Sequence, residues 1–127
     1  MEHRHILIYS PSDDSAAIVK GALSLLGCNI ICCSTPQQTV ELSSALHPSL
    51  VIILRASALL NGSELITRLR PATQRRPAIY VISWQQSEQT ILSLLEIGVD
   101  QYMTFPICLS RLYSKALSAL KKNHQFQ

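Results

Sequence analysis

The stretch HPSLVIIL at residues 47–54 decides the fold, because five apolar residues follow one another in it without interruption. A continuous apolar run of this length is typical of a parallel strand that is covered on both faces. It is far shorter than the roughly 18 residues that a membrane span needs, so no transmembrane segment is expected. Similar runs predict four further strands, at residues 5–9, 29–33, 78–83 and 101–104.

Amphipathic segments lie between these strands and predict helices. The second helix has the clearest start, because Thr35 can act as N-cap, Pro36 fits the first turn and Gln38 completes a capping box. The five expected helices span about residues 13–26, 36–46, 61–70, 87–97 and 109–122.

Five strands and five helices in strict alternation predict an α/β fold. The expected architecture is a three-layer, doubly wound, five-stranded parallel sheet of the flavodoxin-like (βα)5 type. The 127 residues suffice for one domain, with a core at about 5–122 and a polar tail, or the start of a linker, at 123–127. A hydrophobic content of 47% with a net charge of only +3 excludes disorder. No signal peptide is visible, so we expect a cytoplasmic globular domain that does not contact membranes.

The four cysteines are too few for a disulfide scaffold, and their spacing does not match a zinc site. We therefore expect Cys28, Cys32, Cys33 and Cys108 to be small buried hydrophobic residues. A redox role for the first three stays open, because exposure and thiol pKa decide it.

In sheets of this type, ligands bind at the carboxyl ends of the strands. No glycine-rich phosphate loop occurs there, and Asp13 and Asp14 fall in the first turn of a helix, where acids complement the helix dipole. Ser10 and Ser83 follow or end strands, but no histidine stands beside them in the sequence to act as a base. We therefore expect no catalytic residues, no metal and no cofactor.

Several strings resemble the receiver domain of bacterial response regulators (CheY-like). They are HPSLVIIL followed by NGSELITRLR, then PAIYVISW, and finally LLEIGVDQYMTFPICLSRL. Gly98, Asp100, Tyr102 and Pro106 match the family pattern, and the resemblance covers about residues 6–122. It implies the same fold and a role in two-component signal transduction, with Tyr102 at the position of the family's switch aromatic.

The departures from the family pattern concern the phosphorylation chemistry. The acidic pair that holds magnesium is replaced by Ser10 and Pro11, and the phosphoacceptor aspartate is replaced by Leu54. Phe105 stands in place of the lysine, and only the hydroxyl at Ser83 survives. Phosphotransfer needs a carboxylate nucleophile and a neutralising cation. The chain is therefore interpreted as a degenerate pseudo-receiver that binds no magnesium and accepts no phosphoryl group.

Leu54, Phe105 and Ser83 could instead line an apolar niche for a small ligand. Leucine and phenylalanine in place of charged groups could also pack against each other and close the pocket. We expect closure.

The face formed by helix 4, strand 5 and helix 5 is the expected dimer or partner surface, as in receivers that dimerise. On the fourth helix, Leu92 and Leu95 are spaced for the core, and Ile91 and Leu94 form a second apolar pair that we expect at the surface. Single exposed hydrophobic residues are a plain alternative. The expected face comprises Trp84, Ile91, Leu94, Tyr102, Arg111, Tyr113 and Lys115.

These observations favour the N-terminal regulatory and dimerisation half of a transcriptional regulator. DNA would be bound only through a downstream domain, and the pseudo-receiver would form a homodimer independently of phosphorylation. The alternative is a stand-alone protein-interaction module in signalling. An enzyme on the same fold is the least favoured reading, because no catalytic motif supports it.

Overall fold

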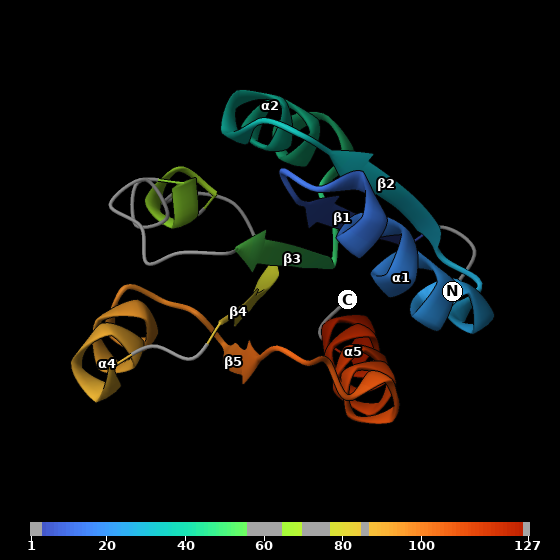
Figure 1. Ribbon diagram of the computed structural model, residues 1–127. Coiled ribbons are helices and arrows are strands. Elements are labelled where there is room, and N and C mark those ends of the chain that lie inside the picture. The colour runs from blue at the N-terminus through green and yellow to red at the C-terminus, as the bar shows by residue number, and fades with distance from the viewer. Residues whose placement is uncertain (1–3, 56–64, 70–76, 85–86, 126–127) are drawn as a thin grey trace.

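The structure is a computed structural model that describes residues 4–55, 65–69, 77–84 and 87–125 (Figure 1). Its five strands form one parallel sheet in the order β2-β1-β3-β4-β5. The strands are β1 (His5–Tyr9), β2 (Asn29–Cys33), β3 (Leu50–Arg55), β4 (Ala78–Ser83) and β5 (Gln101–Thr104). The expected fold class and all five expected strands are confirmed.

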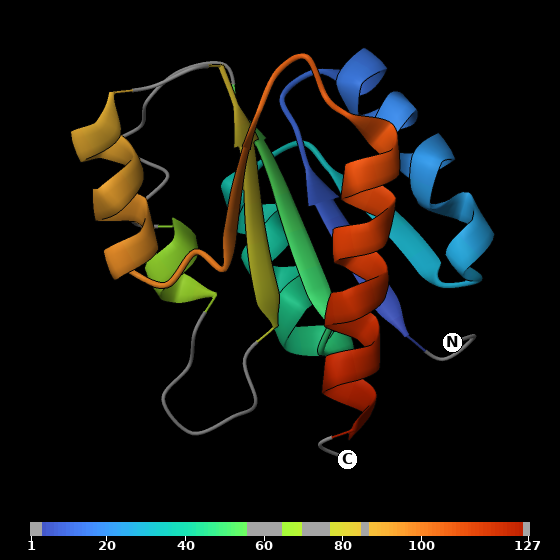
Figure 2. The ribbon, with the colours of Figure 1, turned by 90° about the horizontal axis from the view of Figure 1, so that it is seen from below.

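Helices cover both faces of the sheet (Figure 2). One buried cluster joins α1 and α5 to one face, and a second cluster joins α2, residues 65–69 and α4 to the other. The helices are α1 (Asp13–Leu23), followed by a 3-10 turn (Ser24–Leu26), then α2 (Pro36–Leu46), α4 (Glu88–Glu96) and α5 (Leu109–Gln125). Residues 65–68 are also helical, whereas the expected start of that helix at 61–64 lies outside the described residues.

Local sequence signals explain where these helices begin and end. The Ser12 side chain accepts a hydrogen bond from the Ser15 amide, so Ser12 is the N-cap of α1. Thr35 caps α2 by accepting from the Gln38 amide, as its capping box predicts. Gly27 ends the first helical stretch with a φ of 74°, a left-handed conformation that glycine adopts without steric cost.

The topology brings the candidate site together at one edge of the sheet. Strand order reverses between β1 and β3, and such a switch point is where open α/β sheets bind ligands. The register pairs Leu54 of β3 with Ile82 of β4, and Ser83 with Thr104 of β5. The segments that follow β1, β3, β4 and β5 therefore meet at the carboxyl edge.

The expected orientation of α4 is wrong. Leu92 and Leu95 are 52% and 42% exposed, whereas Leu94 packs against the buried cluster beneath the helix together with Ile97. Ile91 is half-buried. The pairs Leu92/Leu95 and Ile91/Leu94 have the same i, i+3 spacing, and the packing of Leu94 against the cluster leaves Leu92 and Leu95 exposed.

The expectation that all cysteines are buried is also wrong. All four are free, but only Cys33 is buried, while Cys28 is half-buried and Cys32 and Cys108 are exposed. Burial raises the pKa of the Cys28 and Cys33 thiols. Cys32 and Cys33 are neighbours on β2, so their side chains point to opposite faces of the sheet, and only that of Cys33 is buried.

None of the described helices has the length and apolar character that crossing a membrane would require.

Candidate functional site

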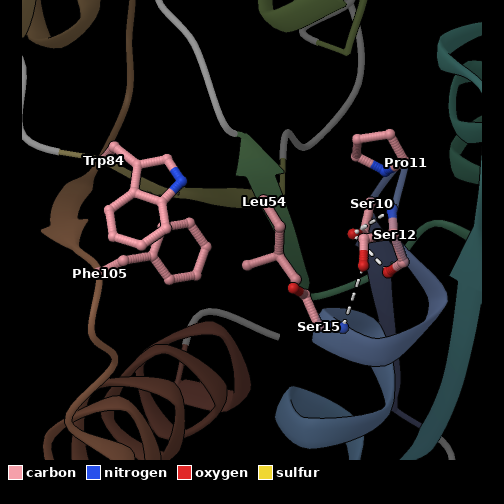
Figure 3. Close-up of a pocket in the computed structure, with 7 residues that line it drawn as sticks. All are labelled: Ser10, Pro11, Ser12, Ser15, Leu54, Trp84 and Phe105. Atoms are coloured by element: carbon pink, nitrogen blue, oxygen red, sulfur yellow. Dashed lines mark hydrogen bonds between the residues drawn. The ribbon is translucent and has the colours of Figure 1, made fainter.

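A pocket of about 130 Å³ lies at the carboxyl edge of the sheet, where the resemblance places the phosphorylation site (Figure 3). It is open to solvent on one side. Leu54 lies between its two sides, which are an aromatic pair and a serine-rich turn. The described lining residues are Ser10, Pro11, Ser12, Ser15, Leu54, Trp84 and Phe105.

The serine-rich turn joins β1 to α1 and is held by its own side chains. The Ser10 hydroxyl donates to the Ser12 carbonyl oxygen at 2.8 Å and accepts from the Ser12 amide at 3.0 Å. Ser10 is only 3% exposed. These hydroxyls therefore shape the turn, at a position where the family pattern has metal-binding carboxylates.

Leu54 is 1% exposed and belongs to the buried cluster beneath α1 and α5. It stands near the end of β3, at the position that the resemblance assigns to the phosphoacceptor. An aliphatic side chain provides no oxygen for a phosphoryl group to form a bond with, so the position contributes packing alone.

Trp84 and Phe105 form the opposite side of the pocket. Their ring centroids are 5.1 Å apart at an interplanar angle of 45°, a tilted arrangement that aromatic pairs favour. The Phe105 amide donates to the Ser83 carbonyl oxygen at 3.0 Å, and the Phe105–Pro106 peptide bond is cis. The hydrogen bond fixes the backbone of Phe105 at the end of β4.

The expected closure of the pocket is wrong. Phe105 packs against the indole of Trp84, and a space remains between this aromatic pair and the serine-rich turn. Ser83 is buried and does not line that space. Ser12, Ser15 and the pairing of Trp84 with Phe105 were not predicted as parts of this site.

Ser83 lies instead next to Tyr102. The Tyr102 hydroxyl donates to the Trp84 carbonyl oxygen at 3.1 Å. Burial raises the pKa of Tyr102, and a hydrogen bond with the Ser83 side chain opposes that rise. The half-buried phenol is thus oriented toward the end of β4, within reach of both residues.

The exposed apolar residues of α4 differ from those that we predicted for the dimer face. Of the predicted residues, Trp84 is 55% exposed and Arg111 is also exposed, whereas the others are half-buried. Leu92 and Leu95 supply the exposed apolar surface of α4 that Ile91 and Leu94 were expected to supply. The half-buried members are Ile91, Leu94, Tyr102, Tyr113 and Lys115.

A second, more polar pocket of about 280 Å³ lies between α5 and the start of β5. The Tyr80 hydroxyl donates to the Lys115 carbonyl oxygen at 2.8 Å, and Asp100 accepts from the Ile79 amide at 2.8 Å. Burial, assisted by the Asp100 charge, raises the pKa of Tyr80 to about 12. Lys115 and Asp100 thus take part in joining α5 and β5 to β4. The pocket is lined by Ala78, Tyr80, Asp100, Gln101, Lys115, Ser118 and Ala119.

Comparison with known proteins supports a receiver domain. No family model matches the sequence. Over 97% of its length, the chain is 25% identical to a Bacillus subtilis protein described as the uncharacterized transcriptional regulatory protein YkoG, of which it covers 54%. The chain therefore spans about half the length of this curated relative.

Solved structures agree more closely in fold than in sequence. A two-component response regulator from Clostridium difficile superposes with a TM-score of 0.80 and 25% identity, over 93% of this chain and 96% of that one. A response regulator from Thermotoga maritima superposes with a TM-score of 0.82 and 19% identity, over 93% of this chain and 98% of that one. HP1043, an orphan response regulator of Helicobacter pylori, superposes with a TM-score of 0.81 and 14% identity, over 94% of this chain and 98% of that one. The chain has the CheY-like fold of response regulator receiver domains.

Proposed function

We propose that this domain is a pseudo-receiver, which regulates without aspartyl phosphorylation. We further propose that it is the N-terminal regulatory and dimerisation half of a DNA-binding transcriptional regulator. The observation that carries the proposal is the buried Leu54 at the phosphoacceptor position, within a pocket whose seven described lining residues are all uncharged.

The chemistry of the pocket supports the loss of phosphotransfer. Phosphoryl transfer to a side chain needs a nucleophile and positive charge on the phosphoryl oxygens. Leu54 supplies no nucleophile, and Phe105 supplies no charge. In the described part of the chain, no three His, Cys, Asp or Glu side chains converge so that they could hold a metal ion.

The orientation of Tyr102 supports an output that is independent of phosphorylation. Its hydroxyl is held by the Trp84 carbonyl oxygen and lies next to Ser83. Both partners belong to the chain itself, so no phosphoryl group is needed to fix the ring. The switch aromatic would then keep one orientation, and the surface around β5 would be permanently ready for its partner.

The surface of α4 supports dimerisation. Leu92 and Leu95 lie one turn apart on α4 and are exposed, and Trp84, which follows β4 and precedes α4 in the chain, is exposed as well. Exposed apolar groups rimmed by polar residues are typical of interfaces, and aromatic residues are enriched in interface cores. A twofold dimer would place two downstream DNA-binding modules on paired half-sites.

Incubation with magnesium and radiolabelled acetyl phosphate tests the proposal. The expected result is that the protein carries no label with the stability of an aspartyl phosphate, which survives acid and is hydrolysed by alkali. The matched control is a restored variant with Ser10→Asp, Pro11→Asp, Leu54→Asp and Phe105→Lys, which reinstates the acidic pair, the acceptor and the lysine. Stable labelling of the unaltered protein would contradict the proposal.

The mass of the native polypeptide in its source cells separates the regulator from the stand-alone module. We expect a mass above 14.1 kDa by the weight of a second domain, because the relative named as a transcriptional regulatory protein is about twice as long. A native chain that ends at Gln127 would exclude the transcriptional regulator and leave the protein-interaction module.

A further inference from the structure

The pocket over Leu54 combines apolar walls with hydroxyl groups that can still donate a hydrogen bond. Leu54 and the rings of Trp84 and Phe105 supply the apolar surface, and Ser12 and Ser15 stand on the opposite side (Figure 3). Small-molecule sites in proteins share this composition, with mostly apolar walls and a few polar groups that fix orientation.

The size of the pocket limits what can enter. Its volume of about 130 Å³ is close to the roughly 150 Å³ of an engineered apolar cavity that binds benzene. One aromatic ring with a short substituent fits this space. A nucleotide or another ligand of that size would extend beyond the pocket into solvent.

The charges near the pocket disfavour an anion. None of the seven described lining residues is charged, and the turn of α1 that carries Ser12 and Ser15 also carries the exposed Asp13 and Asp14. These carboxylates already balance the positive end of the helix. Among the described lining residues, a phosphate or carboxylate would lose its hydration without gaining a cation as partner.

Two hydroxyl groups remain available to a neutral ligand. The Ser12 oxygen accepts from the Ser15 amide at 3.4 Å, which leaves its O–H as a donor. The Ser15 hydroxyl has no hydrogen-bond partner among the described residues. Both can donate to an oxygen atom on the rim of a bound ring.

We infer that this pocket binds a small uncharged aromatic molecule that carries one hydrogen-bond acceptor, such as an aryl alcohol. The inference rests on the proposed function, because a phosphorylated receiver would use the same edge of the sheet for magnesium and phosphate. The ring would stack against Trp84 and Phe105, and its oxygen would accept from Ser12 or Ser15.

Trp84 is the only tryptophan and lines the pocket, so its fluorescence reports occupancy directly. The probe is benzyl alcohol, titrated into the full chain, with benzoate as the charged analogue of similar size. We expect a saturable change with a Kd of about 1–10 mM, as suits a ligand of so few atoms. Benzoate should bind at least tenfold more weakly.

Two variants separate the pocket from non-specific effects of the alcohol. Ser15→Phe fills the pocket from the half-buried face of α1 and should weaken binding at least tenfold, whereas Ser44→Phe on the exposed face of α2 should leave it unchanged. If Ser15→Phe fails to fold, Phe105→Ala removes one wall of the pocket and should weaken binding at least fivefold.

The absence of a saturable change up to 50 mM benzyl alcohol would overturn the inference, as would equal binding by wild type and Ser15→Phe or by benzoate. The same preparation is also treated with labelled acetyl phosphate. A protein that takes up label contradicts the proposed function itself. If the protein neither takes up label nor binds the alcohol, only the inference of an aromatic ligand is contradicted, and the proposed function stands.

Discussion

Helices α4 and α5 flank the same strand, β5, yet they are attached to the sheet in different ways. On α5, Leu112 and Ala116 are fully buried in the cluster that also holds α1. No residue of α4 is fully buried, and Leu92 and Leu95 point outward. Figure 2 shows α5 lying along the sheet and α4 at its margin.

This difference separates a helix that is anchored in the core from one that is more weakly attached. Removing α5 from the sheet would expose fully buried side chains, whereas a shift of α4 would change the environment of side chains that are already partly solvated. Elements with few buried apolar contacts open locally at a low cost in free energy. The elements that move in regulated proteins are drawn from these weakly attached elements. We expect the β4–β5 edge to communicate with α4 while α1 and α5 stay in place.

The largest expected effect comes from truncating a buried leucine of α5. Leu112→Ala should lower the free energy of unfolding by about 2–5 kcal/mol, because a cavity remains in the core. Leu92→Ala on α4 should change it by less than about 0.5 kcal/mol, because the side chain is half exposed. Urea denaturation compares the two variants, and similar costs would remove the distinction between the helices.

The next effect concerns association. Leu92→Glu should weaken the expected dimer at least tenfold, because a carboxylate would be buried without a partner at the interface. Ile18→Glu on α1 is the matched control, since Ile18 is 56% exposed. Analytical ultracentrifugation measures both variants. Loss of the dimer with the Ile18 variant, but not with the Leu92 variant, would move the interface to α1.

The attachment of α5 to β4 gives a pH-dependent prediction. Tyr80→Phe removes the hydrogen bond to the Lys115 carbonyl and should cost about 1 kcal/mol below pH 10. Because the folded-state pKa of Tyr80 is raised to about 12, the unfolded chain releases its proton first as the pH rises from about 10. Wild type should therefore lose its advantage over the variant between pH 10 and 12. A constant difference across that range in chemical denaturation would contradict the raised pKa.

The smallest effect is expected at the β5 edge near α4. Tyr102→Phe deletes the hydrogen bond to the Trp84 carbonyl and should cost roughly 0.5–1 kcal/mol, since the phenol is only half-buried. Amide hydrogen exchange should rise in α4 and remain unchanged in α5. Faster exchange in both helices would indicate that Tyr102 supports the whole sheet.

The sequence was sufficient for the strands and for the positions at their carboxyl ends. Continuous apolar runs specify buried parallel strands, and the caps at Thr35 and Gly27 specify helix boundaries without reference to the rest of the chain. The placement of Ser10, Leu54 and Phe105 around one pocket follows from the parallel topology alone.

Two features depended on packing that a pattern cannot provide. On α4, the pairs 91/94 and 92/95 have the same spacing, so only the approach of the helix to the sheet decides which pair turns inward. At the pocket, Phe105 packs both against the cluster that contains Leu54 and against the Trp84 ring, and a space remains beside them. Trp84 lies 21 positions earlier in the sequence, and no local signal links it to Phe105.

Sedimentation equilibrium with and without magnesium and acetyl phosphate tests most directly whether this receiver-like domain works independently of phosphorylation. We expect a dimer of the same dissociation constant under both conditions, and a Leu92→Glu variant that is monomeric under both. A protein that is monomeric alone and dimerises only with acetyl phosphate would contradict a phosphorylation-independent output. A monomer under both conditions would remove the dimerisation role.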